Sequence, residues 1–348
     1  MAYTTIDDPT KNFNTVLYTG NGSTQSITGV GFKPDLVWIK VRSQAHNHYW
    51  YDIVRGVQYK ISSNSTGGQI DMGSTGLTAF NSDGFSIGDD TDENDNGETY
   101  ASWNWLAGGS QGSSNTDGTI NSTYTSANTT AGFSIVKYTG TGSNATVGHG
   151  LGAAPEMIIF KNTNSTRDWA VYHAGMGDPD EYLTLNQTYD SEDGYNFSNN
   201  TAPTSSVFSV GSLNGNNGSS QEYIAYCFAS KQGFSKFGSY TGNGVASGGG
   251  PFIHLGFRPA FFLFKEYSGA DNWTMMDSKR LGYNNRNDHL FPNLNNVEYA
   301  TDRIDMVSNG IKIIDNDGSI NQSGATYIYM AFAENPFVNS KKIPVNAR

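Results

Sequence analysis

Hydrophobic and polar residues alternate with a period of two along much of the chain. In the segment "TYASWNW", the residues Ala101, Trp103 and Trp105 fall on one face of an extended strand. Apolar runs without alternation, "DLVWIKV", "EMIIFK" and "AFFLFK", predict central strands that are covered on both faces. No window has a convincing apolar period of about 3.6 residues. The pattern predicts an all-β protein in which the Trp103 face is directed to a core.

The pattern recurs three times along the chain. The stretch "YTGNGSTQSITGVGFKPDLVWIK" starts at Tyr18, and related stretches start at Tyr138 and Tyr240. In each copy a proline precedes the central strand, and a tyrosine of a second apolar strand follows it at a nearly constant spacing. These pairs are Pro34 and Tyr100, Pro155 and Tyr223, and Pro259 and Tyr327. The chain therefore contains three copies of one unit of roughly 100 residues.

A unit of this size can bury its own core, and its many short strands separated by turn signals are typical of a β-sandwich or jelly roll. We predict three tandem β-sandwich domains. The expected divisions are an N-terminal arm (1–12), repeat 1 (13–109), a Gly/Ser/Thr/Asn-rich linker (110–130), repeat 2 (131–230), repeat 3 (231–337) and a C-terminal tail (338–348). Because the second linker is short, we expect repeats 2 and 3 to pack closely and repeat 1 to be less tied to them.

The charge of the chain excludes some classes of partner. With 21 basic and 32 acidic residues, the net charge is −11, which disfavours binding to nucleic acid. No apolar run approaches the ~20 residues of a membrane span, so we expect no membrane insertion. The start "MAYTTIDDPTKNF" lacks the basic and apolar regions of a signal peptide. We therefore expect a protein that enters no secretory route.

The aromatic cluster around Trp50 is the first candidate site. Trp50 is peculiar to repeat 1, and an aromatic face suits the apolar face of a sugar ring. We predict an exposed ligand-binding patch formed by His48, Trp50, Tyr51 and Asp52. For Asp52 a structural ion pair with Arg55 is the other interpretation.

The corresponding residues of repeats 2 and 3 bear on the choice between ligand binding and an ion pair for Asp52. Repeat 3 has the same spacing at Asp277 and Arg280, whereas repeat 2 has His173 and Met176. The tryptophans that recur at one position, Trp169 and Trp273, are interpreted as core residues.

The acidic run "GDDTDENDNGET" is the second candidate site. Asp90, Asp92, Asn94 and Asp95 place several oxygen ligands close together, as calcium prefers. An EF-hand loop beginning at Asp92 needs Glu at its twelfth position, but residue 103 is Trp. Weakly bound calcium and a solvated loop both stay open, and no other cofactor is expected.

We predict that the protein is not an enzyme. The sequence has no Ser-His-Asp signature, nucleophile elbow or phosphate loop. A glycan depolymerase needs two carboxylates roughly 5–10 Å apart across a cleft. No carboxylate is shared by all three repeats, so a depolymerase stays only a third alternative.

The motifs "YDIVRG", "FNSDGFSIG", "RDWAVYHAGMG", "GFSKFGSYTGNG" and "YIYMAFAENPFVNS" carry a resemblance over essentially the whole chain. The chain resembles a repeat family of structural and tail-fibre-like proteins of tailed bacteriophages, especially marine ones. This resemblance implies lectin-like β-sandwich repeats and a virion protein, and it brings no catalytic residues.

From the resemblance we expect a tail-fibre or receptor-binding adhesin that recognises host surface glycan without catalysis. Such a protein assembles in the host cytoplasm and is exposed on the particle surface. Its partners are other virion proteins and a host receptor. The alternative is a capsid decoration or head-fibre protein, and a homotrimer stays open.

Overall fold

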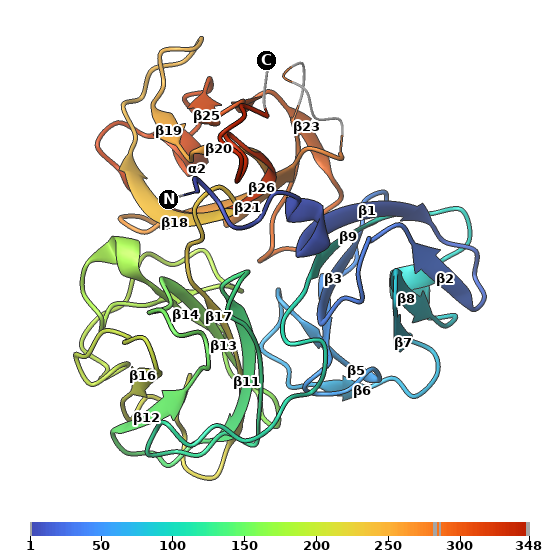
Figure 1. Ribbon diagram of the computed structural model, residues 1–348, viewed down its shortest axis with the longest axis vertical. Coiled ribbons are helices and arrows are strands. Elements are labelled where there is room, and N and C mark those ends of the chain that lie inside the picture. Colours follow the sequence, from blue (N-terminus) through green and yellow to red (C-terminus); the bar gives the residue numbers. More distant parts are fainter. Residues whose placement is uncertain (1, 281–283, 285–286, 346–348) are drawn as a thin grey trace.

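The computed structural model describes residues 2–280, 284 and 287–345. Figure 1 shows three groups of strands arranged around a common centre. Each group has one six-stranded antiparallel sheet and one smaller sheet, and the two α-helices of the described chain have only four residues each. None of the described helices is long and apolar enough to cross a membrane. The predicted all-β class is confirmed.

Repeat 1 begins after a short 3-10 helix, η1 (Pro9–Lys11). Its large sheet has the order β1-β9-β3-β4-β5-β6, and its small sheet has the order β2-β8-β7. The large sheet consists of β1 (Phe13–Thr19), β9 (Thr99–Trp105), β3 (Leu36–Val41), β4 (Tyr49–Asp52), β5 (Tyr59–Ser62) and β6 (Ile70–Asp71). The remaining elements are β2 (Gln25–Thr28), β8 (Gly84–Ile87), β7 (Leu77–Asn81) and the helix α1 (Thr91–Asn94).

Repeat 2 has a large sheet of order β10-β11-β17-β13-β14-β15 and a two-stranded sheet of β12 and β16. The large sheet consists of β10 (Tyr124–Asn128), β11 (Phe133–Thr139), β17 (Glu222–Phe228), β13 (Met157–Asn162), β14 (Ala170–His173) and β15 (Leu183–Thr184). The other elements are β12 (Ala145–Gly148), β16 (Val207–Val210) and η2 (Ala174–Met176). Strand β10 lies in the segment expected to be a linker, so part of that segment belongs to the sheet.

Repeat 3 has a large sheet of order β18-β26-β20-β21-β22-β23 and a small sheet of order β19-β25-β24. The large sheet consists of β18 (Ser235–Thr241), β26 (Thr326–Pro336), β20 (Phe257–Glu266), β21 (Thr274–Asp277), β22 (Asn287–Leu290) and β23 (Tyr299–Thr301). The other elements are β19 (Phe252–His254), β25 (Gly310–Ile313), β24 (Ile304–Val307) and α2 (Gly318–Asn321).

One apolar core is shared by all three repeats. The face predicted from Ala101, Trp103 and Trp105 lies in this core, together with its counterparts Ile224, Tyr226, Phe228, Ile328, Met330 and Phe332. Aromatic rings pack across the repeat boundaries, as in the stacked pair Phe13 and Phe332 with centroids 5.0 Å apart. The opposite faces of the large sheets pack against the small sheets in three separate clusters. This is why the central strands β3 and β13 are buried along their whole length, as predicted.

Backbone hydrogen bonds close the three repeats into a ring. The carbonyl eight residues after each reference proline accepts an N–H from a loop of a neighbouring repeat. These bonds run from Gln69 to Thr163 (2.8 Å), from Ser191 to Tyr267 (3.0 Å) and from Glu298 to Arg42 (3.0 Å). Repeat 1 is therefore bonded to both other repeats. The expectation that repeat 1 is less tied is wrong, because linker length does not determine contacts made through a shared core.

Candidate binding site

The patch predicted around Trp50 lies inside the protein. His48, Trp50, Tyr51 and Asp52 are buried, with exposed fractions of 1% or less. Strand β4 is internal in its sheet, and both of its faces are covered. The Trp50 ring contacts Trp169 and Tyr226 in the shared core, with centroids 5.2 and 4.9 Å apart. The expected exposure is wrong, because a strand sequence with aromatics on both faces indicates a doubly covered strand.

Asp52 belongs to a buried polar contact between repeats. Arg55 forms an ion pair with the carboxylate of Asp52, and both side chains are fully buried. The hydroxyl of Tyr226, in repeat 2, donates to the same carboxylate at 2.8 Å.

The same contact occurs at the boundary between repeats 3 and 1. There Trp103 Nε1 donates to Asp277 Oδ2 at 2.9 Å, and Asp277 pairs with Arg280. At the boundary between repeats 2 and 3, the residue that corresponds to Trp103 and Tyr226 is Met330, which has no donor. His173 replaces the aspartate there, and its Nε2 donates to the carbonyl of Tyr329 at 3.0 Å. One position of the repeat is therefore Asp52, His173 or Asp277, according to the partner available across each boundary.

The acidic run in repeat 1 is organised around a lysine of its own chain. Lys60 Nζ lies 2.6 Å from Asp90 Oδ2 and 3.3 Å from Asp92 Oδ2. The same ammonium lies 4.0 Å from the centroid of the Tyr49 ring. Burial raises the pKa of nearby Glu93 to about 8, and Lys60 opposes that rise. The ammonium of Lys60 thus occupies the place between the carboxylates of Asp90 and Asp92.

The other two predicted calcium ligands do not join this cluster. The Asp95 carboxylate accepts from the backbone N–H of Asn96 at 2.9 Å. Asn94 is buried, and its carboxamide holds the "YTGNG" turn by accepting from Asn21 N at 3.0 Å. Among the residues that the structure describes, no group of three or more His, Cys, Asp or Glu side chains comes together to hold a metal.

Asn94 belongs to a turn that is repeated three times. Asn217 and Asn321 accept from Thr141 N and Asn243 N in the same way, both at 2.8 Å. Each asparagine lies six residues before the recurring tyrosine, a spacing that could have identified it from the sequence. The nearby glycine of "YTG" is required by close packing, because a Cβ at Gly20 would lie 2.1 Å from the carbonyl oxygen of Asp95.

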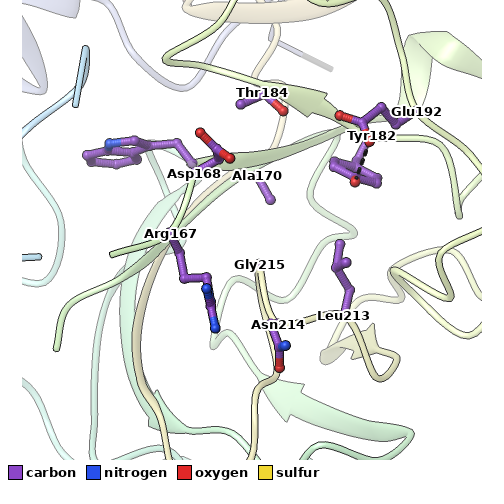
Figure 2. Close-up of a pocket in the computed structure, with 10 residues that line it drawn as sticks. Arg167, Asp168, Ala170, Tyr182, Thr184, Glu192, Leu213, Asn214 and Gly215 are labelled. Atoms are coloured by element: carbon purple, nitrogen blue, oxygen red, sulfur yellow. Dashed lines mark hydrogen bonds between the residues drawn. The ribbon is translucent and has the colours of Figure 1, made fainter. Parts of the chain in front are cut away.

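Repeat 2 has a cavity of about 260 Å³ close to the place that corresponds to the Lys60 cluster of repeat 1 (Figure 2). We call it the repeat 2 pocket. Its wall includes the ring of Tyr182, the side chain of Leu213 and the backbone of Gly215. Its polar residues include Arg167, Asp168, Glu192 and Asn214. Such a combination of an apolar wall with a few polar groups is typical of a small-ligand site, and the volume lies just below the usual ~300–1,000 Å³.

Strand register shows how the repeat 2 pocket corresponds to the lysine cluster. Lys60 immediately precedes Ile61, which pairs with Trp50. Tyr182 immediately precedes Leu183, which pairs with Val171. Trp50 and Val171 hold the same position relative to the reference prolines. Tyr182 therefore occupies in repeat 2 the strand position that Lys60 occupies in repeat 1.

The turn on the other side of the pocket can also be aligned with the turns of repeats 1 and 3. The backbone N–H groups of the recurring asparagines donate at 2.8 Å to the carbonyls of Asp90, Leu213 and Asp317. Leu213 therefore replaces the aspartate of the other repeats, and Gly215 replaces Asp92. Ala170 similarly replaces Tyr49. The pocket exists because these smaller or apolar side chains leave open the space that the lysine cluster fills.

Repeat 3 also fills this space with its own side chains. Arg303 pairs with Asp317 at 2.7 Å and donates to Ser319 Oγ at 2.6 Å. His289, at the strand position of Lys60 and Tyr182, stacks on Tyr299 with centroids 5.5 Å apart. In the described residues of repeats 1 and 3, charged and aromatic side chains thus occupy this position, whereas repeat 2 has an open cavity there.

The repeat 2 pocket is held in shape by its own hydrogen bonds. Tyr182 and Glu192 exchange two backbone hydrogen bonds of 2.9 Å, and the Tyr182 hydroxyl donates to Glu192 Oε2 at 3.0 Å. Burial, reinforced by the Glu192 carboxylate, raises the pKa of Tyr182, so its hydroxyl stays protonated. In the loop that precedes β14, the carbonyl of Arg167 accepts from Lys161 Nζ, which also donates to the carbonyl of Thr66. Burial lowers the pKa of Lys161 to about 7.

A second cavity, of about 400 Å³, lies where repeats 2 and 3 meet the N-terminal arm. Several of its polar groups are already paired within the protein. Tyr3 donates its hydroxyl to the carbonyl of Gly256 at 2.6 Å, and Lys236 Nζ donates to that of His254 at 2.6 Å. We therefore take the repeat 2 pocket as the candidate site. Sequence reasoning missed it, although Leu213 stands where the other repeats have aspartate.

Comparison with known proteins places the chain in a family. The family described as "Domain of unknown function (DUF7483)" matches residues 8–336. No curated protein matches the chain significantly.

Proposed function

We propose that this chain, which belongs to the DUF7483 family, is a non-catalytic surface protein of a bacteriophage virion that binds a host glycan through the repeat 2 pocket. The virion assignment rests on the resemblance of the repeat motifs to phage structural and tail-fibre-like proteins. In this proposal the three repeats act as lectin-like β-sandwich units, and the open site lies in the second.

The observation that carries the binding role is the replacement of a filled cluster by a cavity. Repeat 2 keeps the strands and the turn of repeat 1, but Leu213 and Ala170 open the space between them. Glycan recognition commonly combines an aromatic surface for the apolar face of a sugar with polar groups for its hydroxyls. Tyr182 and Leu213 supply the first, and Asp168, Glu192 and Asn214 supply the second. Tyr195, more than half exposed, lies edge-on to Tyr182 with the two ring centroids 6.5 Å apart.

A glycan array probed with the full chain tests the proposal. We expect saturable binding to a restricted set of host-type glycans and loss of that binding in Tyr182→Ala. The matched control is Tyr299→Ala, which removes an aromatic ring from the same region of repeat 3, next to His289, the residue at the strand position of Tyr182. If Tyr182→Ala does not fold, Asn214→Ala on the exposed rim replaces it. Equal binding by wild type and both pocket variants would contradict the proposal.

Two further measurements test the rest of the assignment. Incubation with the bound glycan should release no reducing ends, and their release would support the depolymerase alternative instead. Immunogold labelling of intact particles should place the chain on the tail. Gold spread over the head would favour the capsid decoration alternative.

A further inference from the structure

Asp168 has a negative charge that its structural role does not need. In repeat 2, Asn186 Oδ1 accepts from the backbone N–H of Trp169 at 2.8 Å. The amide of the same Asn186 donates to Asp168 Oδ1 at 2.7 Å. The contact fixes the loop that enters β14, and its acceptor is a carboxylate.

The other repeats make the same contact with a neutral acceptor. In repeat 1, Asn64 accepts from His48 N at 3.0 Å and donates to Asn47 Oδ1 at 2.7 Å. In repeat 3, Asn293 accepts from Trp273 N at 3.2 Å and donates to Asn272 Oδ1 at 2.7 Å. An amide oxygen therefore suffices for the fold at this position, and the charge of Asp168 is available for another role.

No cation of the described chain forms an ion pair with the carboxylates of the repeat 2 pocket, and the buried Lys161 interacts with Asp168 only at longer range. Figure 2 shows the Arg167 side chain extending away from Asp168 towards Asn214. Within residues 2–280, 284 and 287–345, no ion pair joins Arg167 to Asp168 or to Glu192. Asp168 Oδ2 and Glu192 Oε1 likewise accept no hydrogen bond from these residues. Each carboxylate thus retains one oxygen for a donor from outside the chain.

The corresponding places in the other repeats contain a cation of the protein itself. Lys60 neutralises Asp90 in repeat 1, and Arg303 neutralises Asp317 in repeat 3. Repeat 2 instead combines two carboxylates with an open cavity, and among the described residues no cation is ion-paired with either carboxylate. A charged donor from a ligand would restore the balance that the other two repeats achieve internally.

We propose that the ligand of the repeat 2 pocket carries a protonated amino group, as in a glycan that contains hexosamine with a free amine. The inference rests on the proposed glycan-binding function and specifies its ligand class. The ammonium lies between Asp168 and Glu192, and the sugar ring packs against Tyr182 and Leu213. An acidic glycan is disfavoured by these carboxylates and by the net charge of −11.

Three β-1,4-linked oligosaccharides of equal length test this ligand class: one of glucosamine, one of N-acetylglucosamine and one of glucose. Their affinities for the full chain are measured by titration calorimetry at a mildly acidic pH, where the free amines are protonated. We expect the glucosamine oligomer to bind at least about tenfold more tightly than the other two, because charge-assisted hydrogen bonds are stronger than neutral ones. Added salt should weaken this preference.

The variant Asp168→Asn keeps the acceptor of Asn186 and removes the charge. We expect it to lower the affinity for the glucosamine oligomer about tenfold to a hundredfold, while the affinities for the other two oligomers change little. The matched control is Asn47→Asp, which introduces the same charge into repeat 1 and should leave binding unchanged. Glu192→Gln provides an independent second variant.

The outcomes separate this inference from the proposed function. Equal binding of the three oligomers, or preference for an uncharged one, overturns the ammonium inference but leaves glycan binding intact. Binding of the glucosamine oligomer that Asp168→Asn and Glu192→Gln do not weaken also overturns it. If no glycan binds on the oligosaccharide panel or on the array, the proposed function itself fails.

Discussion

Repeat 1 and repeat 2 build one place in the fold in opposite ways. In repeat 1, Lys60 and Tyr49 fill the space beside the turn, and Asp90 neutralises the ammonium. In repeat 2, Leu213 and Ala170 leave a cavity of about 260 Å³. The strand positions and the turn are the same, so the difference results from a few side chains. The comparison teaches that one copy of a repeat can open a site while its neighbours keep theirs closed.

The residues that the copies share explain why this exchange is tolerated. Asn94, Asn217 and Asn321 hold the same turn in each copy. A buried lysine also recurs six residues after each reference proline, as Lys40, Lys161 and Lys265, and its Nζ donates to backbone carbonyls in every copy. The scaffold does not depend on what fills the space beside the turn.

Removal of the lysine from repeat 1 should have the largest effect on stability. Lys60→Ala leaves Asp90 and the buried Glu93 without their cation, so we expect a loss of about 3–5 kcal/mol in the free energy of unfolding. Urea unfolding followed by tryptophan fluorescence measures it.

A double variant is the control for that loss. Lys60→Tyr combined with Asp90→Leu introduces the repeat 2 residues into repeat 1 and removes one unpaired carboxylate together with the cation. It should be more stable than Lys60→Ala. If the double variant is less stable than Lys60→Ala, the two places are not interchangeable.

The pH dependence of stability should differ between the repeats because Glu93 has no acidic counterpart in repeat 2, where Asn216 occupies its position. Burial raises the pKa of Glu93 in the folded protein from 4.5 to about 8. The folded state therefore binds more protons than the unfolded state between these values. The contribution of Glu93 to stability is fully present below pH 4.5 and is lost as the pH rises through about 8.

Glu93→Gln removes this titration. We expect the stability of wild type relative to Glu93→Gln to fall by about 2–4 kcal/mol across that pH range. Urea unfolding at several pH values measures the difference, in which the buried lysines cancel because both proteins contain them. A difference that does not change with pH would show that Glu93 has the same charge state in folded and unfolded chains.

The smallest effect is expected where the repeats differ only in charge. Asp168→Asn should change the free energy of unfolding by less than about 0.5 kcal/mol, because Asp168 is exposed and the amide acceptor already serves in repeats 1 and 3. Thermal unfolding monitored by circular dichroism tests this. A loss above about 1 kcal/mol would show that the charge has a structural role and would weaken the case for a ligand.

Local patterns in the sequence predicted much of the fold. The alternation in β9 identified the buried face of Trp103, and the continuous run in β3 identified a doubly covered strand. Alternation shows which face is buried but not what covers it, so the shared core could not be predicted. The aromatic run around Trp50 was interpreted as exposed because its strand was not recognised as internal.

The pocket could not be predicted for a related reason. A cavity is defined by side chains that are small or absent, and Ala170 and Gly215 carry no chemical signature of their own. Only alignment of the three copies through their turns shows that Leu213 replaces Asp90 and Asp317. The correspondence of Tyr182 with Lys60 on the other side of the pocket becomes certain only when the strand pairs are known.

The shared core also determines how the chain folds. No repeat has a complete core, because one face of each large sheet is covered only by the other two repeats. We therefore infer a single cooperative folding unit, in contrast to a string of independently stable modules. Closure of the last boundary pairs Arg42 with Glu298, residues 256 positions apart. Contacts of such long sequence separation form slowly, so ring closure is expected to limit the folding rate.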